Sequence, residues 1–77
     1  VGDGEDRLVD VHNPVVPQSI RTRVLAMAQP GDQLWRCPRL SAPRGVLGLL
    51  GVGPRDVVIE WWLLDAQGEL IEAFWEV

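Results

Sequence analysis

The strongest constraint on the fold of this chain is a pair of β-rich segments around a glycine turn near the C-terminus. Residues 56–65 and 70–77 are rich in β-branched and aromatic side chains, which favour strands. Residues 66–68, Ala-Gln-Gly, join them, and a three-residue loop with Gly last is typical of a type I turn followed by a left-handed Gly bulge. Such a turn pairs Asp65 with Glu69. The stretch 56–77 is therefore predicted to be a β-hairpin.

The predicted register behind this turn separates two faces of the hairpin, because side chains along a strand alternate with period two. If pairing continues without a break, one face is wholly apolar and forms the core: Val57, Ile59, Trp61, Leu63, Ile71, Ala73, Trp75 and Val77. The other face is then mixed: Val58, Glu60, Trp62, Leu64, Leu70, Glu72, Phe74 and Glu76.

The mixed face is more apolar than a solvent-facing sheet surface should be. One hypothesis is that it is an interaction surface with a strip of apolar anchors and a carboxylate rim: Trp62, Leu64, Leu70 and Phe74, with Glu60 and Glu72. A second is that the loop of residues 38–52 folds over the strip and buries it. A third is that the chain is a fragment whose missing domain covers the strip.

The remainder of the chain predicts one helix and further strands. Residues 17–29 form the best helix, with Pro17 in its first turn and with Ile20, Val24 and Met27 spaced as one apolar stripe. Pro30 and Gly31 end it. Residues 33–37 are predicted to be a strand, and residues 7–12 a fourth strand or an extended arm. Residues 38–44 are a predicted loop, residues 43–50 a weak helical turn, and Gly51 its left-handed cap.

These elements predict an α+β fold, with one helix packed on an antiparallel sheet of three strands, or four if residues 7–12 join it. Seventy-seven residues allow a single domain, spanning residues 1–77, and residues 1–6 are expected to be a flexible terminus. The order of the strands in the sheet stays open.

Charge and composition limit the classes of partner. The formal charge is −4, and all seven basic residues are Arg. An acidic chain is a poor binder of nucleic acid, since such binding depends on neutralising phosphates. The chain has no apolar stretch of about 18 residues and no secretory signal pattern. We therefore expect a cytoplasmic protein with no cofactor, no metal and no membrane, whose partner is a second copy of itself or a basic protein.

The alternative function is a small enzyme or cofactor binder that uses Cys37 and His12. A catalytic cysteine needs a lowered pKa, from a helix N-terminus or a nearby cation. Cys37 instead precedes Pro38 in a predicted strand, where a buried thiol is the simpler interpretation. His12 is expected to lie in solvent. The glycine-rich run of residues 45–53 lacks the Gly-Lys-Ser/Thr of a phosphate loop. With neither a nucleophile nor a phosphate site indicated, we expect no enzyme.

Residues 30–35, reading Pro-Gly-Asp-Gln-Leu-Trp directly after the helix, resemble a recurring pattern in small uncharacterised bacterial and phage proteins. In those proteins a helix is followed by Pro-Gly-Asp, a strand that carries Trp, a Ser/Pro-rich loop and a hairpin. The resemblance covers residues 20–75 in the order of their elements, and the glycine-rich loop departs from the pattern. It implies the same α+β order and a bacterial setting, but no activity and no functional residue.

Overall fold

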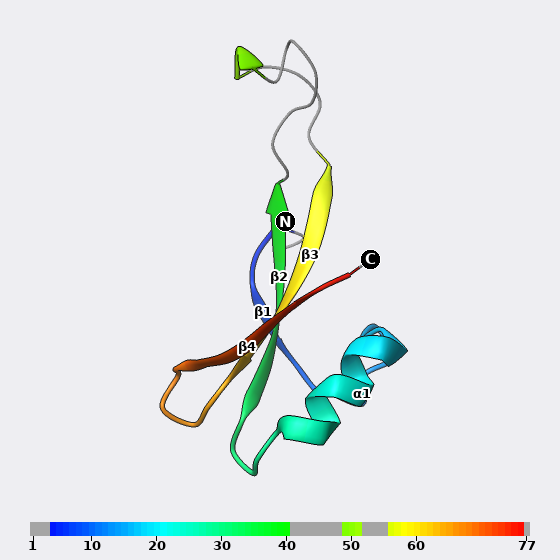
Figure 1. The fold of residues 1–77 in the computed structure, drawn as a ribbon, viewed down its shortest axis with the longest axis vertical. Coiled ribbons are helices and arrows are strands. Elements are labelled where there is room, and N and C mark those ends of the chain that lie inside the picture. Colours follow the sequence, from blue (N-terminus) through cyan, green and yellow to red (C-terminus); the bar gives the residue numbers. More distant parts are fainter. Residues whose placement is uncertain (1–3, 41–48, 52–55, 77) are drawn as a thin grey trace.

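The computed structural model describes residues 4–40, 49–51 and 56–76 (Figure 1). Its elements in chain order are β1 (Arg7–Val9), α1 (Gln18–Met27), β2 (Gln33–Leu40), β3 (Val57–Leu64) and β4 (Leu70–Trp75). The four strands form one sheet in the order β1-β2-β3-β4, and every neighbouring pair is antiparallel. The predicted α+β fold is therefore confirmed, and the segment at 7–12 supplies the fourth strand.

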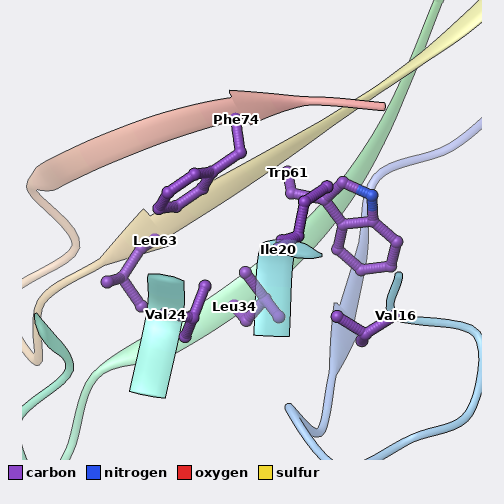
Figure 2. Packing of buried hydrophobic residues seen from close by; sticks show 7 residues of the cluster. All are labelled: Val16, Ile20, Val24, Leu34, Trp61, Leu63 and Phe74. Carbon is purple, nitrogen blue, oxygen red and sulfur yellow. The ribbon is translucent and has the colours of Figure 1, made fainter. Parts of the chain in front are cut away.

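Helix α1 packs on one face of the sheet, called the inner face below (Figure 2). Its buried side chains are Ile20 and Val24, one turn apart, and they join a core cluster with residues of β2, β3 and β4: Leu34, Trp61, Leu63 and Phe74. The prediction that Met27 continues the stripe is wrong, because Met27 is exposed. Ala28, the next residue, packs on the core instead. Gly31 has φ of 92°, which only a glycine adopts easily, and completes the predicted turn into β2.

Arg21 ties the connection between β1 and α1 to the helix. Its guanidinium donates hydrogen bonds to the backbone carbonyls of Val11, Asn13 and Val16, at 2.8, 2.8 and 3.1 Å. Charge-assisted hydrogen bonds of this kind are stronger than neutral ones. They hold an irregular segment in place and present Val16 to the core, where its side chain is buried.

The turn of the β3–β4 hairpin has the predicted geometry. The Asp65 amide donates to the Glu69 carbonyl at 2.8 Å, and the Gly68 amide donates to the Asp65 carbonyl at 2.9 Å. Gly68 has φ of 83°, as the left-handed bulge requires. The Asp65 carboxylate adds two hydrogen bonds of 2.9 Å from the amides of Gln67 and Glu69. The turn prediction and the Asp65–Glu69 pairing are confirmed.

Behind the turn the register departs from the predicted one. Leu64 opposes Leu70 as expected, but Leu63 opposes Glu72, and Ile71 is left as a second bulge. From Glu72 onward every β4 residue therefore lies on the face opposite to the predicted one.

This shift corrects the predicted placement of the β4 aromatics. Phe74 opposes Trp61 and is 0% exposed, so its placement as an exposed anchor on the mixed face is wrong. Trp75, predicted to be in the core, is 58% exposed and opposes Glu60. Glu72 likewise lies on the inner side of the sheet, in solvent, and not beside Glu60.

The bulge suits the different hydrogen-bonding needs of the two aromatic side chains. Phe74 has no polar atom and can be buried completely, whereas a buried indole N–H needs an acceptor. On the solvent side, Nε1 of Trp75 donates to Glu60 at 3.1 Å. A bulge changes which side chains face inward while leaving the strands paired on either side of it.

Strand β2 runs three residues beyond its predicted end, through Pro38 to Leu40, so the predicted loop at 38–44 is wrong for those residues. β1 pairs only with residues 34–36, so beyond them β2 lies at an edge on that side, where a proline is tolerated. Of the predicted helical turn at 43–50, residues 43–48 lie outside the described residues. Leu49 is helical, and Gly51 has φ of 75°, as its predicted role as a left-handed cap requires.

Candidate interaction surface

The face of the sheet opposite α1, called the outer face, receives side chains from all four strands. Directly opposed residues of antiparallel strands share a face, so the register arranges the outer side chains in rows. One row runs across all four strands and is apolar: Leu8, Trp35, Trp62 and Ala73. The next runs across β2, β3 and β4: Cys37, Glu60 and Trp75. A third brings Gln33, Leu64 and Leu70 together.

Helix α1 leaves most of the outer face open in the described part of the chain, although Cys37 in its second row is 1% exposed. Helix α1 packs on the inner face, and the described loop residues Leu49 and Leu50 are 89% and 71% exposed, so they bury little against anything. Leu8, Leu70 and Trp75 are exposed, while Trp35 and Trp62 are half-buried. Contiguous apolar area of this kind makes the outer face a candidate contact surface.

Glu60 holds two tryptophans of this face in fixed positions. Its two carboxylate oxygens accept hydrogen bonds from Nε1 of Trp62 at 2.9 Å and from Nε1 of Trp75 at 3.1 Å. An aromatic side chain that is ordered before binding loses less entropy when a partner arrives. This arrangement therefore suits a recognition surface.

Arg39 extends the cluster on the β1 side. Its guanidinium lies over the ring of Trp62, 5.3 Å from the centroid, and forms an ion pair of 2.7 Å with Asp6. The hydrogen bond from Arg39 holds the pKa of Asp6 below its ordinary value. Asp6 neutralises the charge of Arg39. Glu60, at the centre of the face, forms no ion pair with any of the described residues, so its negative charge is not neutralised in this way.

Four of the predicted site residues come together on this face, namely Glu60, Trp62, Leu64 and Leu70. Phe74 and Glu72 do not, because of the bulge. The residues that sequence reasoning missed are Leu8, Trp35, Arg39 and Trp75. Leu8 and Trp35 join Trp62 through the pairing of β1 with β2 and of β2 with β3, and the sequence left that strand order open. Nothing in the sequence indicated Trp75, because its position depends on the bulge.

The structure does not bring Cys37 and His12 together as a nucleophile and a base. Cys37 lies in the middle of β2 and is 1% exposed, whereas His12 is exposed in the turn beyond the end of β1. Burial, together with the charge of Asp6, raises the pKa of the Cys37 thiol. A thiol with a raised pKa is a poor nucleophile, so the geometry lends the enzyme hypothesis no support.

We expect the native Cys37 thiol to resist alkylation at pH 8, with labelling at least about tenfold slower than in urea-unfolded protein. The raised pKa also has a consequence for stability. The folded thiol stays protonated where the unfolded thiol ionises, so the free energy of unfolding should fall as the pH rises above about 9. Mass spectrometry of iodoacetamide adducts would measure the first effect, and urea titrations at pH 8 and pH 10 the second. Rapid labelling of the folded protein at pH 8 would contradict this assignment.

A groove of about 400 Å³ lies between β1 and α1 on the inner side. Its apolar lining comes largely from core residues. Its two carboxylates, Asp10 and Asp32, each accept a hydrogen bond of 2.7 Å from a nearby backbone amide. They act as turn caps. Within the described ranges, no group of three His, Cys, Asp or Glu side chains could hold a metal ion, and none of the helices could span a bilayer.

Fold and surface together define a class of protein: a small α+β domain whose four-stranded sheet packs on a helix with one face and presents tryptophans on the other. Comparison of the chain with protein-family models, curated proteins and solved structures finds no match. The resemblance carried by residues 30–35 stays a prediction.

Proposed function

We propose that this domain is a protein-binding module whose working surface is the outer face of the sheet and whose partner is basic. The observation that carries the proposal is the Glu60 cluster, in which one carboxylate holds Trp62 and Trp75 on the outer face. Tryptophan side chains in such positions dominate the binding energy of protein interfaces.

The charge distribution favours a basic partner. The segment of residues 56–76 contains no basic residue and six acidic ones: Asp56, Glu60, Asp65, Glu69, Glu72 and Glu76. All seven arginines precede it in the chain. The hairpin that contributes Trp62 and Trp75 to the outer face is thus strongly acidic, and complementary charge across an interface steers association and selects the partner.

A second copy of the chain is the alternative partner, and the same charges disfavour it. Two outer faces brought together would place the Glu60 carboxylate of one copy near that of the other, and like charges across an interface cost free energy. We therefore expect the isolated protein to be monomeric in size-exclusion chromatography with light scattering. A dimer that the Trp75→Glu substitution dissociates would support the outer face as an interface but would refute the basic partner.

The proposal predicts binding of a peptide of alternating Arg and Leu, and no binding of the matched peptide of alternating Glu and Leu, in isothermal titration calorimetry. The Trp75→Ala variant should bind the basic peptide about 30-fold more weakly, which corresponds to about 2 kcal/mol, because the substitution removes an exposed aromatic anchor. Affinity should also fall with added salt.

Glu60→Gln and Glu72→Gln form a matched pair of controls, since each removes one carboxylate. Glu60 lies in the outer face, whereas Glu72 is a solvent-exposed residue on the inner side. Weakened binding in the first variant and nearly unchanged binding in the second would agree with the proposal. Equal losses in both would indicate attraction by net charge alone and would contradict a defined outer-face site.

A further inference from the structure

β4 is an edge strand of the sheet, and the backbone groups that it turns away from β3 can be assigned. The Glu76 amide donates to the Ile59 carbonyl at 3.2 Å. Hydrogen-bonded and non-hydrogen-bonded pairs alternate along an antiparallel ladder. The backbone amide and carbonyl of Phe74, two residues before Glu76, therefore also face β3. The amides and carbonyls of Ala73 and Trp75 consequently point away from β3, at the edge of the four-stranded sheet.

We infer that the basic partner binds as an extended segment added to β4 as a fifth strand. The inference rests on the proposed function and specifies how the partner binds. Addition of a strand to a sheet edge supplies affinity through main-chain hydrogen bonds and specificity through alternate side chains. The bulge at Ile71 interrupts the regular edge, so the docking stretch is short and centred on Ala73 and Trp75.

Side-chain placement on the added strand explains why this partner is basic. A residue opposite Trp75 would lie on the outer face next to Trp75, in the row that also contains Glu60. There an arginine could stack on the Trp75 ring, as Arg39 stacks on Trp62 at 5.3 Å. Its two sequence neighbours, which are leucines in the alternating peptide, would point to the inner side of the sheet.

The carboxylates of Glu72 and Glu76 oppose pairing of β4 with a second copy of β4. Such a pair would bring Glu72 and Glu76 close to their counterparts, and charged side chains along an edge are a common protection against self-association. The other edge of the sheet consists of the three residues of β1 and, beyond them, the end of β2, where Pro38 lacks an N–H donor and Arg39 carries a positive charge. β4 is therefore the edge that a basic strand can use.

Amide hydrogen exchange followed by NMR tests this inference with the alternating Arg and Leu peptide as the probe. At saturation the amides of Ala73 and Trp75 should exchange at least about tenfold more slowly, whereas the Phe74 amide, already bonded to β3, should change little. Protection of all three amides alike, or of none, would overturn the inference.

Backbone methylation of the peptide is an independent test. Two peptides with N-methyl groups on alternate residues, one on the odd and one on the even positions, have the same side chains. If the peptide adds as a strand, one of the two should lose binding at least about tenfold and the other should not, because only one set of amides faces β4. Equal binding by both would overturn strand addition and leave the outer-face proposal standing. No binding by the unmethylated peptide would overturn both.

The Ala73→Pro substitution tests the same edge from the protein side. Proline removes the outward N–H without removing a hydrogen bond to β3, so the variant should keep its thermal midpoint and lose peptide affinity at least about tenfold. Unchanged affinity in a folded variant would contradict the role assigned to this amide. If the variant does not fold, the methylated peptides still decide the question.

Discussion

The Phe74→Ala variant is expected to lose about 3–5 kcal/mol of its free energy of unfolding. Phe74 is 0% exposed, packs in the cluster beneath α1, and lies under the guanidinium of Arg23, 4.6 Å from the ring centroid. A domain of 77 residues has a total stability of about 4–12 kcal/mol, so the loss would unfold much of the population. Urea titration followed by far-ultraviolet circular dichroism would measure it.

Trp75→Ala is the matched control, because it removes a larger aromatic side chain from the neighbouring position. Trp75 is 58% exposed, and its substitution should cost no more than about 1 kcal/mol. The two variants also test the register directly. In a hairpin without the bulge at Ile71, Trp75 would be buried and Phe74 exposed, and the order of the two effects would be reversed.

The Trp61→Ala variant should be destabilised by a similar amount, about 3–5 kcal/mol. Trp61 is 0% exposed and is the largest fully buried side chain of the described residues. It lies opposite Phe74, and both side chains belong to the core cluster. Removal of the indole would leave a cavity that the surrounding β3, β4 and α1 side chains cannot fill without moving. Thermal unfolding by differential scanning calorimetry would show the lowered midpoint.

Trp61→Phe separates packing from hydrogen bonding at this position. The variant keeps an aromatic ring but loses the 2.9 Å hydrogen bond that Nε1 of Trp61 donates to Glu76. We expect a loss of about 1–2 kcal/mol, smaller than that of the alanine variant. If the phenylalanine and alanine variants were equally unstable, packing of the ring would not be the main contribution of Trp61.

Arginine side chains cover aromatic rings on both faces of the sheet. Arg23 of α1 lies over Phe74 on the inner face, and Arg39 of β2 lies over Trp62 on the outer face. Within the described residues Trp75 has no such contact, although its indole is held by Glu60. A partner that supplies an arginine at this position would repeat a contact the domain already makes internally.

The local elements of this fold follow from the sequence because their causes are local. The turn at residues 66–68 depends on a glycine that tolerates positive φ, and α1 depends on a proline at its start, a Pro-Gly pair after its end and an apolar stripe between them. These signals led to the hairpin, the helix and the α+β class. For the same reason Glu60, Trp62, Leu64 and Leu70 were correctly predicted to share a face, since Leu70 lies close to the turn.

The tertiary structure alone decided which aromatic residues face the core. The bulge at Ile71 lies only two residues beyond a correctly predicted turn, yet no local signal marks it. The contacts that accompany it are long-range: Phe74 packs under α1 with no polar atom to satisfy, whereas Trp75 finds its acceptor on the open face. The strand order likewise depends on pairing between distant segments, and it brings Trp35 beside Trp62. The sequence by itself thus determined the elements and the fold class, while packing across the sheet determined the composition of the outer face.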